Sequence, residues 1–176
     1  MEQTKGLVMV YTGDGKGKTT AALGLALRAS GHGARVFMVQ FRKSDPGYGE
    51  IKAINKFLPA FTVVQSERSS IIRRVDLTQD DIDDARRVFK TGREAVESGQ
   101  YSLVIFDEIN FAIDYGMIPI ADVLEMLKNR PSSVDIVLTG RNARQEIMDA
   151  ADLVSEVREI KHHFSSGIKA RPGIEF

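Results

Sequence analysis

Four short runs of apolar residues place the strongest constraint on the fold of this chain. They are nearly continuous in β-branched and large apolar residues instead of alternating between apolar and polar ones. The runs are "GLVMVYT" (6–12), "RVFMVQF" (35–41), "SLVIFDE" (102–108) and "DIVLTG" (135–140). Because a strand buried on both faces needs apolar side chains on both, such runs are typical of a parallel sheet covered by helices. Residues 61–65 predict a fifth strand, and residues 153–160 an edge strand.

Helical patterns separate these runs, at residues 18–30, 78–99, 119–130 and 142–151. Thr78 followed by early acidic residues is typical of a helix start, and Gly31 is typical of a helix end. Strands that alternate with helices predict the α/β class, with a doubly wound, mostly parallel sheet of five to six strands. We expect the 176 residues to form one domain, 1–176, that is least regular between residues 42 and 75.

A glycine-rich loop, "TGDGKGKTT", follows the first apolar run at residues 12–20. Glycines permit backbone N–H groups to approach a phosphate, and the next helix presents its positive N-terminal end to the anion. Lys18 supplies a mobile cation, and Thr19 a hydroxyl in position to bind Mg²⁺. The spacing departs from the usual pattern G-x-x-x-x-G-K-[ST], since Thr12 stands where the first glycine belongs. The alternative is a turn with incidental lysines, but the strand-loop-helix context favours a nucleotide site in a P-loop NTPase (RecA-like) fold.

Charged residues end two further apolar runs, and the carboxyl ends of parallel strands meet at one edge of a sheet. Asp107 and Glu108 end the third run, where a carboxylate suits Mg²⁺ or its waters. Their alternative roles are to cap the next helix or to pair with arginines. Arg141 follows the fourth run, where a guanidinium can brace phosphate oxygens. Its alternative partners are a helix end or Glu146.

Two more segments carry candidate ligand-binding groups. Gln40, Arg42 and Lys43 leave the second run at the same predicted edge, as binding residues or as an exposed basic turn. The tail "EIKHHFSSGIKARPGIEF" (159–176) keeps glycines, cations and aromatic residues to its end. Its cations either reach an anionic ligand or are solvated; they include Lys161, His162 and Lys169.

Composition excludes several other classes of function. Lys and Arg total 24, as do Asp and Glu, so no overall field recruits nucleic acid or an acidic membrane. The chain has no cysteine, which excludes disulfides, thiolate zinc sites and cysteine nucleophiles. No apolar stretch approaches the roughly 18 residues of a membrane span. We therefore expect a cytoplasmic protein without membrane or nucleic-acid partners.

Taken together, the motifs resemble those of the P-loop ATP:corrinoid (cob(I)alamin) adenosyltransferase family. The matching segments are spread in the same order over nearly the whole chain. They read "YTGDGKGKTTAALG", "GHGARVFMVQFRKS", "VIFDEIN", "LTGR" and "IKHHFSSGIKARPGIEF". The resemblance implies transfer of the 5′-deoxyadenosyl group of ATP to the Co(I) of a reduced corrinoid, with release of triphosphate. It also implies that the triphosphate lies reversed in the loop, so that C5′ faces the second substrate.

The resemblance further implies roles for individual residues. Lys18 and Arg141 would neutralise the leaving triphosphate, and Thr19 with Glu108 would hold Mg²⁺. Asp107 would support the metal site without binding the ion directly. A homodimer and a flavoprotein reductase as partner are also implied. The nucleotide-binding residues would be Gly13, Asp14, Gly15, Lys16, Gly17, Lys18, Thr19, Thr20 and Gln40.

Two departures from the family pattern concern the corrinoid and the phosphate loop. The chain has no tryptophan, whereas the family's loop after the third strand often carries an aromatic pair that includes one; here the region reads "SERSSIIRRVD". Asp14 stands where asparagine is common and adds a negative charge to the loop. Two alternatives remain open from the residues: a RecA-like ATPase or small-molecule kinase, and a nucleotide-binding module without turnover.

Overall fold

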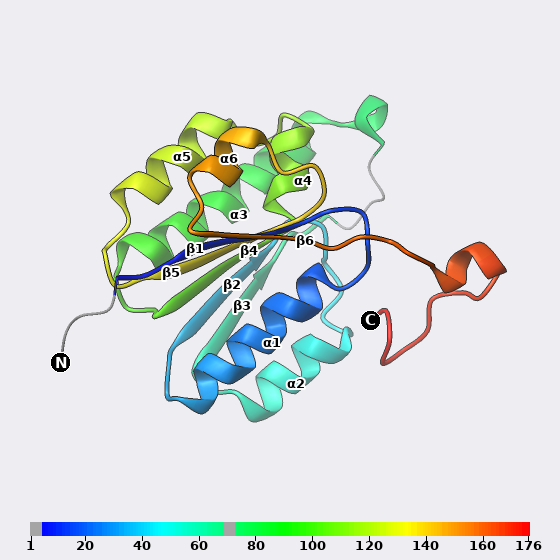
Figure 1. Ribbon diagram of the computed structural model, residues 1–176, viewed down its shortest axis with the longest axis horizontal. Coiled ribbons are helices and arrows are strands. Elements are labelled where there is room, and N and C mark those ends of the chain that lie inside the picture. The colour runs from blue at the N-terminus through cyan, green and yellow to red at the C-terminus, as the bar shows by residue number, and fades with distance from the viewer. Residues whose placement is uncertain (1–4, 69–72) are drawn as a thin grey trace.

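The computed structural model describes residues 5–68 and 73–176, which form a six-stranded parallel sheet with helices on both faces (Figure 1). The order of the strands is β3-β2-β4-β5-β1-β6. The strands are β1 (Val8–Thr12), β2 (Val36–Gln40), β3 (Phe61–Gln65), β4 (Leu103–Asp107), β5 (Asp135–Thr139) and β6 (Leu153–Glu156). Every pairing is parallel. The predicted doubly wound α/β sheet is therefore confirmed.

Helices from successive parts of the chain cover the two faces of the sheet, as Figure 1 shows. One face carries α1 (Lys18–Gly31) and α2 (Gly49–Phe57). The other carries α3 (Gln79–Glu97), α4 (Ile109–Asp114), α5 (Ile120–Asn129) and α6 (Gln145–Asp149). Two short 3₁₀ helices are present: Arg74–Asp76 lies between β3 and α3, and His163–Ser166 lies in the C-terminal tail. None of the helices in the described part combines the length and apolar character that crossing a membrane takes.

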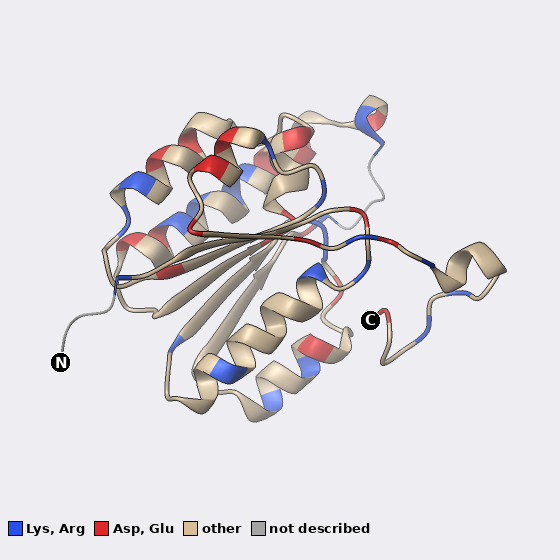
Figure 2. Cartoon of the chain, viewed as in Figure 1, with Lys and Arg blue, Asp and Glu red and all other residues tan. Residues whose placement is uncertain are grey.

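The central strand β4 shows why the apolar runs are continuous. Leu103 and Ile105 pack into the core on the side of α1 and α2, whereas Val104 and Phe106 pack into the core on the opposite side. All four side chains are at most 2% exposed. Outside the sheet, acidic and basic residues are interspersed along the helices (Figure 2), in keeping with the balanced total of charges.

Two helices were not predicted, and two predicted elements have different bounds. Within residues 42–75, expected to be the least regular part of the chain, lies α2, anchored by two buried residues, Ile51 and Ile54. Helix α4 was not predicted, because it begins directly after β4 and its apolar residues continue those of the strand. The edge strand ends at Glu156 and not at residue 160, and the helix expected at 142–151 shortens to α6.

Helix ends follow the predicted capping in one of two cases. Thr78 caps α3 through a capping box, in which its hydroxyl accepts from the Asp81 backbone and the Asp81 carboxylate accepts from the Thr78 backbone. Gly31, predicted as the cap of α1, is instead its last residue. The cap is His32, and the left-handed turn falls on Gly33 (φ 80°).

Candidate active site

The phosphate loop connects β1 to α1 and is shaped by the chain that follows β6. Val157 N donates to Thr12 O, and Gly15 N donates to Val157 O, both at 2.8 Å. A Cβ on Gly13 would lie 2.5 Å from Val157 O, and one on Gly15 would lie 2.7 Å from Arg158 C. Gly13 and Gly15, two of the glycines that depart from the usual spacing, are therefore required because the loop packs against residues 157–158.

Gly17 has a different role, because a Cβ there would meet nothing within 4 Å. Its φ of 125° is one that side chains rarely permit. This backbone turns the chain into α1, whose first residue is Lys18. The N-terminal amides of a 14-residue helix consequently face the loop, as anion binding requires.

Lys18 is folded back onto the loop that precedes it. Its Nζ donates to Gly13 O at 2.7 Å and to Gly15 O at 2.8 Å, and only 7% of the residue is exposed. Burial lowers the pKa of Lys18 below its ordinary value, while the nearby Glu108 carboxylate acts in the opposite direction. The ammonium group is thus held inside the loop by backbone carbonyls rather than by a carboxylate.

Asp107 is the centre of a buried polar network at the carboxyl end of β4. Its Oδ1 accepts from Thr19 Oγ1 at 2.8 Å and from Thr139 Oγ1 at 2.7 Å. Its Oδ2 accepts from Gln40 Nε2 at 3.2 Å and lies 3.4 Å from Lys43 Nζ. The network links β2, β4, β5 and the first turn of α1, so that a single fully buried carboxylate positions the hydroxyl of Thr19.

Gln40 lies in the floor of the site, although it was predicted to border the ligand. It is fully buried, is paired in register with Asp107, and accepts from Gln65 Nε2 at 2.9 Å. Its side chain contacts Asp107 and Gln65 on the two neighbouring strands, and it does not line the cavity described below. Its structural role is to hold the Asp107 carboxylate.

Glu108 occupies an unusual backbone conformation at the start of α4. Its φ of 67° and ψ of 22° lie in the left-handed region, which is uncommon for residues other than glycine and is often found at functional sites. The Glu108 backbone N–H donates to Thr139 Oγ1 at 2.9 Å, which fixes this turn. Burial, and next the Asp107 charge, raise the pKa of Glu108, whereas Arg42, Lys18 and Lys43 oppose the rise. A half-buried carboxylate that is costly to ionise is thereby held beside Asp107.

A cavity of about 670 Å³ lies over these groups. Its wall contains residues 14–20 of the phosphate loop, Glu108 and Arg141. The predicted loop residues Asp14, Lys16 and Thr20 are exposed and line this wall with Gly15, Gly17, Lys18 and Thr19, whereas Gly13 lies behind it. Arg141 Nη2 donates to Asp14 O at 3.3 Å. The structure thus brings together the loop, one carboxylate and one arginine that were predicted from separate motifs.

Arg42 and Lys43 add two cations to the wall of the cavity and are half-buried, so they do not form an exposed basic turn. The Arg42 guanidinium lies 4.2 Å from the centre of the Phe111 ring, in a cation–π contact. Lys43 Nζ lies 3.2 Å from a Glu50 carboxylate oxygen. Burial alone would lower the pKa of Lys43, but Asp107 and Glu50 raise it above its ordinary value. Both side chains are therefore fixed toward the cavity.

The C-terminal tail closes one side of the cavity through residues 173–176 and His162. The Phe176 ring centre lies 6.2 Å from that of Tyr48, just before α2. Lys161 and Lys169 are exposed and do not line the cavity. Glu50 belongs to the loop 42–50, which the family resemblance places beside the ligand, but the sequence did not point to Phe111, which lies on a helix that was not predicted, nor to Glu175.

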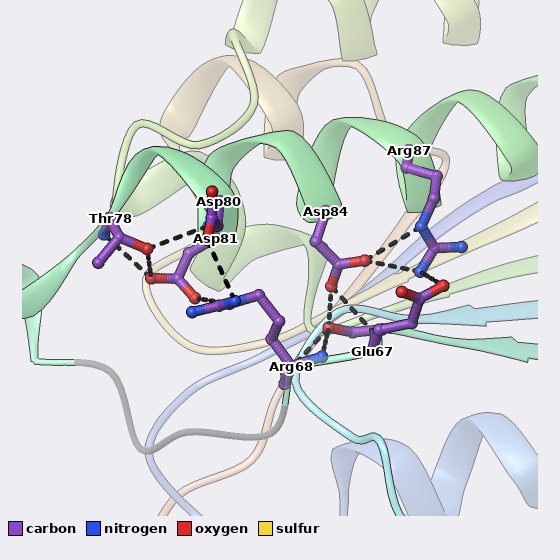
Figure 3. A network of polar contacts seen from close by, with 8 residues as sticks. Glu67, Arg68, Thr78, Asp80, Asp81, Asp84 and Arg87 are labelled. Atoms are coloured by element: carbon purple, nitrogen blue, oxygen red, sulfur yellow. Dashed lines mark hydrogen bonds and ion pairs between the residues drawn. The ribbon is translucent and has the colours of Figure 1, made fainter.

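A second polar cluster connects the end of β3 to the start of α3 (Figure 3). Arg68 Nε donates to Asp81 Oδ1 at 2.5 Å, and Arg87 Nη2 to Asp84 Oδ1 at 2.6 Å. The Thr78 hydroxyl lowers the pKa of Asp81. The cluster ties the beginning of the region that reads "SERSSIIRRVD" to α3; residues 69–72 of this region lie outside the described part.

Solved structures resemble this fold at low sequence identity. The RadB recombinase is 17% identical with a TM-score of 0.54, covering 90% of this chain and 77% of that one. The flagellar accessory protein FlaH from Methanocaldococcus jannaschii is 15% identical with a TM-score of 0.62, covering 87% of this chain and 71% of that one. At such identities the likeness concerns the fold alone, and it confirms the predicted P-loop, RecA-like architecture.

Proteins related in sequence identify the family of this chain, which the solved structures do not. A corrinoid adenosyltransferase of Sinorhizobium sp. is 38% identical over 98% of this chain and 81% of its own length. Those of Escherichia coli K12 and Salmonella typhimurium are 33% and 34% identical, each over 99% of this chain and 88% of the relative. The family model described as ATP:corrinoid adenosyltransferase BtuR/CobO/CobP matches residues 4–176. This chain therefore belongs to the ATP:corrinoid adenosyltransferase family, whose reaction makes adenosylcobalamin.

Proposed function

We propose that residues 1–176 act as one domain that performs the family's reaction in the cavity beneath the C-terminal tail. The observation that carries this assignment of the site is the convergence of the phosphate loop, Glu108 and Arg141 on one cavity. In the reaction, a Co–C5′ bond forms while the C5′–O bond of ATP breaks. The electron pair of the broken bond leaves with the triphosphate. Because Co(I) is itself the nucleophile, the protein needs no general base.

The protein then contributes position and charge. In our proposal the triphosphate lies in the loop formed by residues 13–20, reversed so that C5′ faces the corrinoid. Its oxygens replace the Gly13 and Gly15 carbonyls as partners of Lys18, and Arg141 braces them from the end of the neighbouring strand β5. Cations fixed before the reaction stabilise the charge that develops on a leaving group without having to reorganise. In-line placement of C5′ against cobalt contributes the remaining acceleration.

The residues beside the loop also suit Mg²⁺, since the donors are a hydroxyl and two carboxylates, the hard oxygen ligands that this ion prefers. Across residues 5–68 and 73–176, no three histidine, cysteine or carboxylate side chains gather into a metal-binding cluster. Mg²⁺ is usually bound by a few protein oxygens, and substrate phosphates and waters complete its coordination. We propose that Thr19 and Glu108 hold the ion and that Asp107 orients Thr19. When bound, Mg²⁺ would supply further positive charge to the triphosphate.

Glu108→Gln tests this assignment. We expect the Mg²⁺ concentration for half-maximal activity to rise by about ten- to a hundred-fold, because an amide is a weaker ligand than a carboxylate. The measurement is initial rate against Mg²⁺ at saturating ATP. The matched control is Glu146→Gln, an exposed residue of α6. An Mg²⁺ titration of Glu108→Gln that overlays the wild-type curve would remove Glu108 from the metal site.

The reaction itself is tested by incubating the protein with ATP, Mg²⁺ and chemically reduced cobalamin in the absence of oxygen. We expect adenosylcobalamin and intact triphosphate in equal amounts. Formation of ADP and phosphate at a rate indifferent to the corrinoid would instead support the ATPase or kinase alternative. Tight ATP binding without turnover would support a nucleotide-binding module.

Finer properties are carried over from the family resemblance. We propose that the enzyme acts in the cytoplasm, where ATP is available, as a homodimer supplied with electrons by a flavoprotein reductase. Sedimentation of the purified chain tests the dimer, and replacement of the chemical reductant by a reduced flavoprotein tests the electron donor.

A further inference from the structure

The last four residues of the chain form a turn at the edge of the phosphate loop. Gly173 N donates to Phe176 O at 2.8 Å, and Glu175 N to Arg171 O at 3.1 Å. Residues 173–176 line the same cavity as residues 14–20. The tail is therefore part of the wall that a bound polyphosphate meets.

The Glu175 carboxylate lies close to His163 and within ion-pair distance of Lys16, the second lysine of the loop. Glu175 Oε2 accepts from the Arg171 backbone N–H at 2.8 Å, which fixes the side chain. Glu175 Oε1 lies 3.9 Å from Lys16 Nζ and 3.1 Å from His163 Nε2. This oxygen is buried and accepts no hydrogen bond from the described residues. The contact with Lys16 is thus an ion pair without a hydrogen bond, which a better anion can replace.

The two loop lysines differ in their partners. Lys18 is held by the backbone carbonyls of Gly13 and Gly15, whereas Lys16 faces a full negative charge from a distant part of the sequence. The Arg171 backbone N–H, and then His163 and Lys16, hold the pKa of Glu175 below its usual value, although burial acts against them. The carboxylate is consequently a fixed anion within reach of a cation that the triphosphate also needs.

We propose that Glu175 competes with the polyphosphate for Lys16 and so promotes release of the triphosphate product. The inference rests on the proposed function, since it takes residues 13–20 as the triphosphate site. A polyanion surrounded by Lys16, Lys18 and Arg141 leaves slowly unless another anion takes over one of these cations. Glu175 is a positioning residue in this scheme, because it acts through Lys16 and not on the reacting atoms.

The test is the affinity of Glu175→Gln for inorganic tripolyphosphate, measured by calorimetry. Glutamine keeps an oxygen for the Arg171 N–H but removes the charge. We expect binding about two- to five-fold tighter than wild type, the range for loss of one competing ion pair near the surface. Steady-state turnover should become more strongly inhibited by triphosphate. The control Glu159→Gln, an exposed glutamate of the same tail, should change neither quantity.

Two further measurements distinguish competition from a general change in the tail. In a Lys16→Ala background, Glu175→Gln should no longer alter tripolyphosphate affinity. The difference between Glu175→Gln and wild type should also shrink as salt is raised, because screening weakens the contact. Unchanged or weaker binding by Glu175→Gln, or an effect that persists without Lys16, would overturn the inference. Failure of the proposed function gives a different result. In that case Lys18→Ala would bind tripolyphosphate as tightly as wild type does.

Discussion

Replacement of Lys18 by alanine is expected to reduce adenosyl transfer by about a hundred- to a thousand-fold, the loss typical when one preorganised group that stabilises developing charge is removed. Lys18 is the loop cation closest to the backbone that would surround the triphosphate, with its Nζ 2.7 Å from Gly13 O. Alanine leaves the charge on the leaving group without this partner. The measurement is the initial rate of adenosylcobalamin formation, with tripolyphosphate affinity measured in parallel.

The fold should survive this change, because Lys18 stands at the first position of α1, where alanine is a good helix former. Circular dichroism and the melting temperature serve to check it. Two matched lysines serve as controls: Lys16→Ala should cost less because its side chain is 41% exposed, and exposed Lys161→Ala should have no effect. Wild-type turnover by folded Lys18→Ala would refute the assignment of the phosphate loop as the triphosphate site.

The sheet was predictable because burial on both faces imposes one composition on each strand. The apolar runs located all four central strands to within one or two residues. Helices α2 and α4 were not predictable in the same way. The first exposes most of its surface around Ile51 and Ile54, and the second is only six residues long, so neither displays enough turns for a helical period to emerge.

The phosphate loop was predictable from its local sequence, but the reason for its glycine spacing was not. Gly13 and Gly15 are constrained by Val157 and Arg158, more than 140 residues further along the chain. No local pattern reports a contact of this kind. The contact between Glu175 and Lys16 could not be predicted from the sequence for the same reason, since it depends on how the tail returns to the loop.

The division of roles between two adjacent carboxylates also required the structure. The sequence shows only that Asp107 and Glu108 end an apolar run. The backbone decides the rest: Asp107 completes β4 and points inward, whereas Glu108 turns into the left-handed region and reaches the cavity. The buried position of Gln40 follows from its pairing with Asp107 across the sheet.

Asp107→Asn is expected to have the largest effect on stability, lowering the free energy of unfolding by about 3 kcal/mol, as when one partner of a buried charge pair is removed. The carboxylate accepts from Thr19, Thr139 and Gln40 and lies 3.4 Å from Lys43 Nζ. Each carboxylate oxygen serves two of these groups, so an asparagine must turn its NH₂ group toward one pair of donors, which then loses its acceptor. The melting temperature of a chain of this size should fall by roughly 6–12 °C.

The same substitution should impair catalysis, because the Thr19 hydroxyl loses the acceptor that orients it toward the proposed Mg²⁺ site. We expect the activity at saturating Mg²⁺, measured well below the melting temperature, to fall by about ten- to a hundred-fold. Asp149→Asn, an exposed change on α6, controls for the chemistry of the substitution. Adding Lys43→Met to Asp107→Asn should recover part of the lost stability but none of the activity, because it removes an ammonium left with Glu50 as its one carboxylate partner among the described residues, without restoring the acceptor for Thr19. Recovery of activity in the double variant would mean that Asp107 serves to neutralise Lys43 and does not position Thr19.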